Sequence, residues 1–254
     1  MKRIALIGVT GVDWWVDPKK KNFVRAVTPP GFVCENMHAR FGTHSLESNS
    51  DEAYNAPFIL EQVVRANREG MDAIVIDCAC DPILDAAREV STIPVVGPRK
   101  AALHLALTLG TKFTIVTVQG PSLVKCMESG VRREGLDAFC ASVRYLKMPV
   151  LDIAKRPEEA QAELLAVCRQ AVLEDGADVI VLGCTGLSHE VDLKPIMTEV
   201  GVPVLDPFVV AVRTAAMLVD AGISHSKVAY PLPPKKPIVE DPSLKGVFDR
   251  TLRE

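Results

Sequence analysis

The chain has 254 residues, a formal net charge of −3 and a hydrophobic fraction of 48%. This length can bury one large core or two small ones, so stability requires neither disulfides nor a structural metal. The nearly balanced charge disfavours a nucleic-acid partner, and no apolar run approaches the ~18 residues that span a bilayer, which argues against a membrane protein. The seven cysteines are odd in number and follow no secretory signal, so we expect reduced thiols in a cytoplasmic protein.

Strands and helices are predicted to alternate along the chain. Four short, continuous runs rich in β-branched residues are typical of strands buried on both faces of a parallel sheet. They span residues 4–9, 73–77, 113–118 and 179–183. Proline in the first turn and glycine after the last turn mark four helices. These helices span about residues 57–70, 98–110, 157–176 and 207–222.

Two segments lack such a regular pattern. Residues 10–52 are predicted to form either a lid or an interface. Residues 230–242 hold five prolines, so we expect an extended surface arm that can pack on a partner subunit.

Three pairs of segments repeat in the same order along the chain. The pairs are 4–9 with 113–118, 70–78 with 176–184, and 93–98 with 202–207, at offsets of 106 to 109 residues. A repeat of this kind indicates a tandem duplication. We therefore predict an α/β fold of two pseudo-symmetric, doubly wound parallel-sheet domains with the active site in the cleft between them. The first comprises residues 1–98, completed by 208–254, and the second comprises residues 99–207.

Two cysteines stand at equivalent positions of the two repeats. Cys78 and Cys184 each follow a buried strand, and ligands of open α/β sheets bind at this end of the strands. Cys80 competes with Cys78, but Asp72 precedes Cys78 by six residues just as Asp178 precedes Cys184. We expect the two thiols to face each other across one cleft. Each is also expected to lie at a helix N-terminus, where the helix dipole favours a thiolate.

Two opposed thiols suit proton transfer at a carbon atom. A thiolate removes a proton from one face and a thiol returns one to the other face, with the roles exchanged for the opposite enantiomer. The backbone N–H groups near Ala79 and Thr185 are predicted to stabilise the developing enolate. This chemistry needs no cofactor and no metal; a metal site at Cys78, Cys80 and His189 is disfavoured because no second spaced pair accompanies it. The residues predicted to contact substrate are Thr10, Ser45, Ala79, Cys80, Thr117, Thr185 and Gly186.

Several stretches resemble one enzyme superfamily. They are residues 42–48 (GTHSLES), Cys78-Ala79-Cys80-Asp81-Pro82, Leu182-Gly183-Cys184-Thr185-Gly186 and residues 222–227 (GISHSK). The chain resembles the aspartate/glutamate/hydantoin racemase superfamily, and most of all its hydantoin (allantoin) racemase branch. The resemblance implies two pseudo-symmetric domains, a cofactor-free cleft, Cys78 and Cys184 as the acid/base pair, and a homo-oligomer.

The paired thiols predict cofactor-independent racemisation of a small molecule, and the resemblance implies a 5-substituted hydantoin or allantoin as the substrate. The C–H of a hydantoin lies between a carbonyl group and a ring nitrogen, which makes it acidic enough for thiol catalysis. Alternatives within enzymes are an aspartate- or glutamate-type racemase and a maleate-type cis–trans isomerase. The alternative outside enzymes is a small-molecule binding protein that keeps the same fold. The other cysteines, Cys34, Cys126, Cys140 and Cys168, are expected to be packing or surface thiols.

Overall fold

The computed structural model describes residues 1–234, which form two lobes, each built on a four-stranded parallel sheet. The first sheet has the order β2-β1-β3-β4 and the second β6-β5-β7-β8, so the same topology occurs twice. The strands are β1 (Lys2–Gly8), β2 (Phe32–His38), β3 (Ala73–Asp77), β4 (Val95–Val96), β5 (Phe113–Thr117), β6 (Cys140–Tyr145), β7 (Val179–Leu182) and β8 (Val204–Leu205). The predicted α/β class and the duplication are confirmed.

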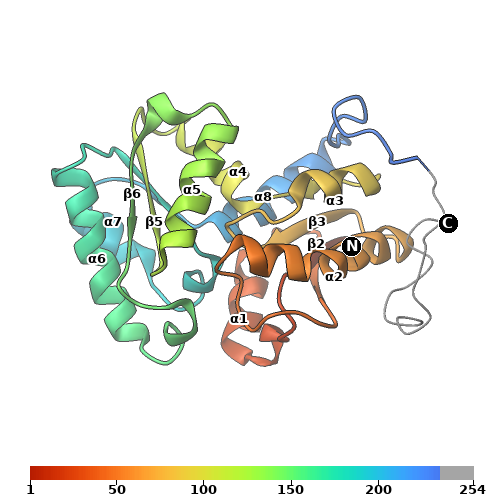
Figure 1. The fold of residues 1–254 in the computed structure, drawn as a ribbon, viewed down its shortest axis with the longest axis horizontal. Helices are drawn as coiled ribbons and strands as arrows, with labels where there is room; N and C mark the ends of the chain where they lie inside the picture. The colour runs from red at the N-terminus through yellow and green to blue at the C-terminus, as the bar shows by residue number, and fades with distance from the viewer. Residues whose placement is uncertain (235–254) are drawn as a thin grey trace.

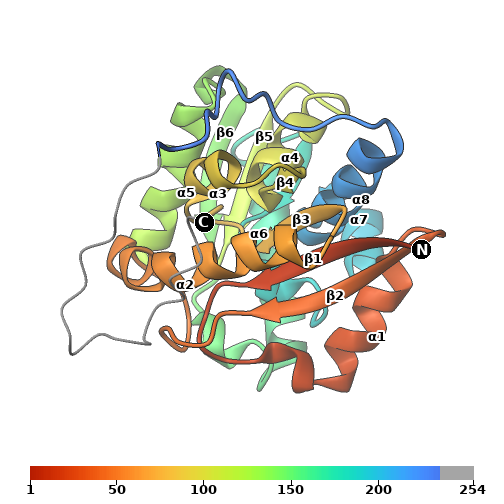
Figure 2. The same cartoon turned by 90° about the vertical axis from the view of Figure 1, so that its right-hand side faces the viewer.

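Helices cover both faces of each sheet (Figures 1 and 2). The α-helices are α1 (Pro18–Val27), α2 (Asn49–Arg68), α3 (Leu84–Val90), α4 (Pro98–Ala106), α5 (Pro121–Arg133), α6 (Pro157–Leu173), α7 (Leu193–Val200) and α8 (Pro207–Asp220). Short 3-10 turns are η1 (Trp14–Val16), η2 (Asp137–Phe139), η3 (Val150–Asp152) and η4 (Thr185–Leu187). In β1, Ile4 and Leu6 pack toward α1 and α8, whereas Ala5 and Ile7 pack toward α2 and α3. Burial of both faces explains why the strand is apolar throughout.

The last helix of each repeat packs on the sheet of the other repeat. Leu103 and Ala106 of α4 lie in the core of the second sheet, although α4 directly follows β4. Phe208 and Ala211 of α8 lie in the core of the first sheet, although α8 directly follows β8. The helices α4 and α8 also contact each other between the two lobes (Figure 1). This exchange holds the two lobes together and fixes the cleft between them.

Part of the predicted secondary structure was wrong. The helix expected to begin at Pro57 begins at Asn49, and Pro57 lies inside α2. The side chain of Ser48 caps this helix by accepting a hydrogen bond from the Asp51 N–H, and Asp51 with Glu52 supplies the acidic first turn that favours a helix start. Residues 10–52 are also more regular than expected, because they contain α1 and the edge strand β2.

The segment that follows α8 packs on α3. His225 Nε2 lies 2.7 Å from the carbonyl oxygen of Arg88, the Lys227 ammonium donates to the same oxygen, and the Arg88 guanidinium donates to the hydroxyl of Tyr230. Residues 235–242 of the predicted proline-rich arm lie outside the described residues. Among the helices of residues 1–234, none combines the length and the apolar character that a bilayer crossing requires.

Asp206 should make the stability of the protein depend on pH. It caps α8 and accepts a hydrogen bond from Ser188 Oγ at 2.7 Å. These hydrogen bonds lower its pKa, but its burial outweighs them and raises the pKa of Asp206 to about 6. Because the folded state holds this proton more tightly than an unfolded chain with a pKa of about 3.9, the free energy of unfolding should fall as the pH rises from about 4 to 6. Asp206→Asn keeps the accepting oxygen without titrating. In melting experiments the Tm of this variant minus the Tm of the wild type should increase as the pH rises from about 4 to 6. A difference in Tm that does not change with pH would contradict the assignment.

Candidate active site in the cleft between the lobes

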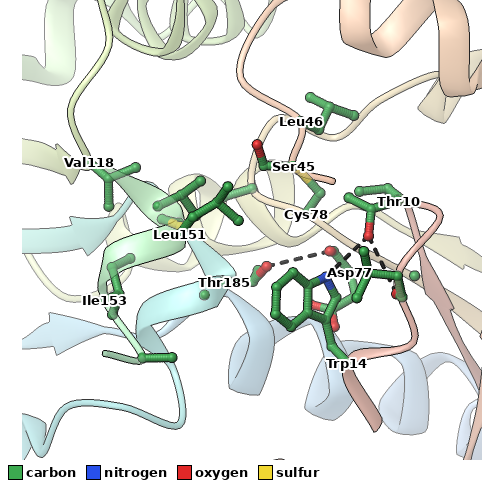
Figure 3. Close-up of a pocket in the computed structure, with 18 of the residues that line it drawn as sticks. Thr10, Trp14, Ser45, Leu46, Asp77, Cys78, Val118, Leu151, Ile153 and Thr185 are labelled. Carbon is green, nitrogen blue, oxygen red and sulfur yellow. Dashed lines mark hydrogen bonds between the residues drawn. The ribbon is translucent and has the colours of Figure 1, made fainter. Parts of the chain in front are cut away.

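The two lobes enclose a cleft at the carboxyl ends of their central strands. Its cavity volume is about 140 Å³, and an engineered cavity of about 150 Å³ in another protein binds benzene, so one small ring fits. The ends of three strands border this cavity, and the residues that line it there are Gly8 of β1, Asp77 of β3 and Gly183, which follows β7. Cys78 and Cys184 both line it, and Figure 3 shows Cys78 among the labelled lining residues.

The environment of Cys184 differs from the prediction. The expected helix N-terminus is only the three-residue turn η4, and Cys78 is separated from α3 by the loop 79–83. Burial raises the pKa of Cys184 to about 12, although the N–H groups of Gly186 and Leu187 lower it in part. The predicted preference of Cys184 for the thiolate was therefore wrong, since burial penalises the charged form more than the turn stabilises it. Burial therefore favours the protonated form of Cys184.

Most residues predicted to contact substrate line the same cleft. They are Thr10, Ser45, Ala79, Cys80, Thr185 and Gly186. Thr117 does not line it: the residue is fully buried, and its hydroxyl donates to the carbonyl of Gly183 at 3.1 Å. Thr117 packs directly against Gly183, where a Cβ would fall 2.7 Å from Thr117 Cβ, so its side chain is covered by the chain that follows β7.

The wall formed by the first lobe is polar. The Lys20 ammonium donates to the Asp77 carboxylate at 2.7 Å, and both side chains are largely buried. Thr185 reaches across from the second lobe and donates to the carbonyl of Asp77 at 3.4 Å (Figure 3). His189 also lines the cavity, and burial together with the nearby Lys20 lowers its pKa, which favours the neutral imidazole. Lys20 was missed in the sequence because nothing in the pattern of residues around it indicates a contact with Asp77.

Two adjacent tryptophans, the only ones in the chain, also line the cleft. The indole N–H of Trp14 donates to Thr10 Oγ1 at 3.1 Å, and its ring makes a T-shaped contact with the His44 ring, with centroids 5.9 Å apart. Trp15 follows in the same turn, η1. The Trp14-Trp15 pair in the segment after the first strand was the available sequence signal, because large aromatic residues near a predicted substrate loop indicate a binding surface.

A buried asparagine joins the two loops that carry Thr10 and Ser45. Asn55 of α2 is fully buried and donates to the carbonyl of Val9 at 3.0 Å. Its side-chain oxygen accepts the N–H of Thr43 at 2.9 Å, and its amide also reaches the Thr43 hydroxyl. Both the NH2 group and the oxygen of the Asn55 side chain thus have hydrogen-bond partners, and these bonds hold the loop after β1 against the loop that contains Thr43.

One part of the wall formed by the second lobe is apolar. Its side chains come from the end of β5, from α5 and from the turn η3 with the residues after it. They are Val118, Leu123, Val150, Leu151, Ile153 and Ala154. Figure 3 shows Val118, Leu151 and Ile153 on the side of the cavity opposite Thr10 and Trp14. The cleft thus offers hydrogen-bonding groups on one side and an apolar surface on the other.

A charged cluster lies behind Cys80. Arg99 is only 5% exposed; its guanidinium lies 3.8 Å from the Asp81 carboxylate and donates to the carbonyl of Cys126 at 3.3 Å. A side chain at position 130 would meet this guanidinium, because a Cβ on Gly130 falls 2.3 Å from Arg99 Cζ. The Cys80 thiol, which hydrogen-bonds the Cys126 sulfur, and the Arg99 charge lower the pKa of Cys126 to about 7. Cys126 therefore differs from the ordinary packing thiol expected from the sequence.

Alkylation should distinguish Cys126 from the other thiols. At pH 7 about half of Cys126 should be thiolate, the nucleophilic form, so iodoacetamide should label it quickly. Cys140 is a matched control, because it is also partly exposed and lies in the same lobe, while burial raises its pKa to about 11. Peptide mass spectrometry between pH 5 and 9 should give a labelling midpoint near 7 for Cys126. Equal labelling of both residues at pH 7 would contradict the assignment.

Within residues 1–234, one group of side chains is close enough to share a metal ion. Asp17, His189 and Glu190 bring their ligand atoms within 4.8 Å of one another. Glu190 already forms an ion pair with Lys19 and lies 3.5 Å from His189 Nε2, and neither Cys78 nor Cys184 belongs to the group.

Comparison with known proteins identifies the family. The model of the Asp/Glu/hydantoin racemase family matches residues 19–215. The chain belongs to this family. It is 40% identical over 190 residues to a hydantoin racemase of Rhizobium meliloti, covering 74% of this chain and 78% of that protein. It is 38% identical over 201 residues to a hydantoin racemase of Pseudomonas sp. (strain NS671), covering 79% and 80%.

A solved structure agrees with the family assignment. The allantoin racemase from Klebsiella pneumoniae superimposes with a TM-score of 0.87 at 33% identity, covering 94% of this chain and 97% of that one. The resemblance noted in the sequence is confirmed, and so is the enzyme class, since racemases are isomerases. The racemase fold also explains why a duplicated chain forms a single cleft between its two halves.

Proposed function

We propose that this chain is a cofactor-independent racemase in which Cys78 and Cys184 are the two catalytic acid/base groups. The observation that carries the proposal is that both thiols, from equivalent strand ends of the two repeats, line one small cleft. Opposed proton donors and acceptors are what inversion of a C–H stereocentre requires. One group removes the proton from one face of the carbon, and the other delivers a proton to the opposite face.

The roles of the two cysteines depend on the handedness of the substrate. For one enantiomer the Cys78 thiolate takes the proton from carbon, and the Cys184 thiol, which is protonated near neutral pH, donates one from the other side. For the other enantiomer the proton movements run in reverse, starting from the form in which Cys78 carries the proton and Cys184 is the thiolate. The backbone N–H groups of Ala79 and Thr185 have no acceptor within residues 1–234, and both residues line the cleft. They are suited to stabilise the enolate oxygen that develops when the proton leaves.

The substrate class that we propose is a 5-substituted hydantoin or allantoin. Relatives named hydantoin racemase and a structural neighbour named allantoin racemase support this class. The polar wall suits the amide groups of the ring. The apolar wall suits an aliphatic or aromatic substituent better than the ureido group of allantoin, because an apolar surface cannot satisfy ureido hydrogen bonds. We therefore expect faster turnover of hydantoins with apolar substituents.

Deuterium exchange with polarimetry tests the proposal. Single enantiomers of a panel of 5-substituted hydantoins, allantoin, aspartate and glutamate are incubated with the enzyme in deuterated buffer. Loss of optical rotation together with deuterium at the ring carbon of the hydantoins is expected. Turnover of aspartate or glutamate alone would replace the hydantoin assignment with amino-acid racemisation, and a covalent cysteine adduct with a maleate-like diacid would indicate the cis–trans isomerase.

We also propose that the enzyme acts as a homo-oligomer, the state implied by the family resemblance. Light scattering coupled to size exclusion measures the mass directly. A mass well above the 27.5 kDa of one chain is expected. A monomer with full activity would contradict this part of the proposal.

A further inference from the structure

Asn36 lies near the end of β2, on the polar wall of the cleft. In the sheet it is paired with Leu6 of β1, and it lines the cavity. Its side-chain amide donates to Asp13 Oδ1 at 2.9 Å. The same carboxylate oxygen accepts the backbone N–H of Trp15 at 3.0 Å, so Asp13 holds both Asn36 and the tryptophan turn.

The contact with Asp13 determines which way the Asn36 amide is turned. A carboxylate oxygen only accepts hydrogen bonds, so the NH2 end of the amide must face Asp13 and the oxygen must point elsewhere. That oxygen is shielded from solvent, and no group among residues 1–234 donates to it. Buried acceptors in proteins are almost always satisfied, and because the residue Asn36 lines the cavity, a ligand bound there can supply the missing donor.

The neighbours of Asn36 on this wall complement such an acceptor. Lys20 is a cation that donates to Asp77, and both of these residues line the same cavity. The wall therefore combines a free acceptor with a nearby cationic donor. A cyclic ureide, in which N–H and C=O groups alternate around the ring, presents the matching pattern.

We propose that Asn36 is a specificity-determining residue whose side-chain oxygen accepts a hydrogen bond from a ring N–H of the substrate. The inference rests on the proposed function, because it assumes a cyclic ureide in the cleft. A site built to bind an N–H group rejects analogues that lack it, since its own buried acceptor is then left unsatisfied. Asn36 would thus distinguish ring ureides from substrates with an acidic C–H but no N–H at this position.

The test combines substitutions in the protein and in the ligand. The ligands are a 5-alkylhydantoin and its 1-methyl and 3-methyl derivatives, each of which lacks one ring N–H. The proteins are the wild type, Asn36→Ala and the control Asn67→Ala. Asn67 lies on α2 away from the cleft and has its amide satisfied by Val63 and Thr92. Binding is followed by the fluorescence of Trp14 and Trp15, which line the cavity, and racemisation is followed by polarimetry.

The expected result is a loss of selectivity confined to one variant. The wild type and Asn67→Ala should bind the parent hydantoin about 10- to 100-fold more tightly than one of the methylated derivatives. Asn36→Ala should bind the parent more weakly by a similar factor and should no longer discriminate against that derivative. The same pattern is expected in kcat/KM, while the melting temperature of each variant reports whether its fold is intact.

Two other outcomes separate this inference from the proposed function. If the parent is racemised but methylation costs the same in the wild type and in Asn36→Ala, the role of Asn36 is overturned and the racemase assignment stands. If the parent is bound with the expected loss of selectivity but is not racemised, the role of Asn36 stands and the racemase assignment fails. A parent that is neither bound nor racemised overturns both.

Discussion

Replacing either Cys78 or Cys184 with serine is expected to lower the rate of racemisation by at least about 10²-fold, and up to about 10⁴-fold. A serine hydroxyl ionises far less readily than a thiol, so it can neither take the proton from carbon nor return one at a useful rate. Because each enantiomer needs both groups, both directions of racemisation should be lost in both variants. Polarimetry with each pure enantiomer measures the two directions.

The residual chemistry of these two variants gives a sharper result. In each variant the remaining thiol still faces one side of the substrate, so it can exchange the C–H of one enantiomer with solvent without inverting it. Cys78→Ser and Cys184→Ser should therefore exchange opposite enantiomers. Cys140→Ser is the control, because this thiol is partly exposed, lies on the edge strand β6 and does not line the cleft. Full racemase activity in either cleft variant would rule out the two-thiol mechanism.

Gly183→Ala is expected to lower both the stability and the activity of the enzyme. A Cβ at this position would lie 2.7 Å from Thr117 Cβ and 3.0 Å from Ile115 Cγ2, which belong to the fully buried strand β5. Overpacking of this kind lowers the free energy of unfolding by about 1–3 kcal/mol. Because Cys184 is the next residue, the shift needed to relieve the clash should also misplace its thiol and reduce kcat by about tenfold or more.

A second glycine separates the two effects. Gly201 follows α7 with a φ of +72°, and a Cβ there would meet no atom within 4 Å. Gly201→Ala should lower the free energy of unfolding by about 1–2 kcal/mol through backbone strain alone, far from Cys184. Chemical denaturation and steady-state rates should show similar destabilisation in both variants but loss of activity only in Gly183→Ala. Equal activity in the two variants would contradict the steric effect on Cys184.

The central strands were predictable from sequence, whereas the edge strands were not. The strands β1, β3, β5 and β7 are buried on both faces, so each appears as a continuous apolar run that repeats in the second half. The edge strands β2 and β6 include polar side chains such as Glu35, Asn36 and Arg144, which pair with partners distant in sequence. Pairing on only one side relaxes the apolar requirement, so the pattern that identifies a buried strand is absent.

The candidate site was predictable only where the duplication identified it. Cys78 and Cys184 stand at matching positions of two repeats, and both line the cleft. The polar wall depends on the way residues 10–46 fold over the first sheet, and Lys20, which meets Asp77 through tertiary packing, carried no local signal. The raised pKa of Cys184 likewise carried no local signal in the sequence, since the burial of this residue depends on how the two lobes pack around it.

The most direct test of the two-thiol mechanism is the position of deuterium early in the reaction. One pure enantiomer of a 5-alkylhydantoin is incubated with the wild-type enzyme in deuterated buffer, and both enantiomers are recovered after a few per cent of conversion. Two groups on opposite faces predict that the product carries deuterium from the start, while the recovered substrate gains deuterium more slowly. Equal deuterium in substrate and product, or a product that retains the original proton, would indicate a single base and contradict the assignment of Cys78 and Cys184.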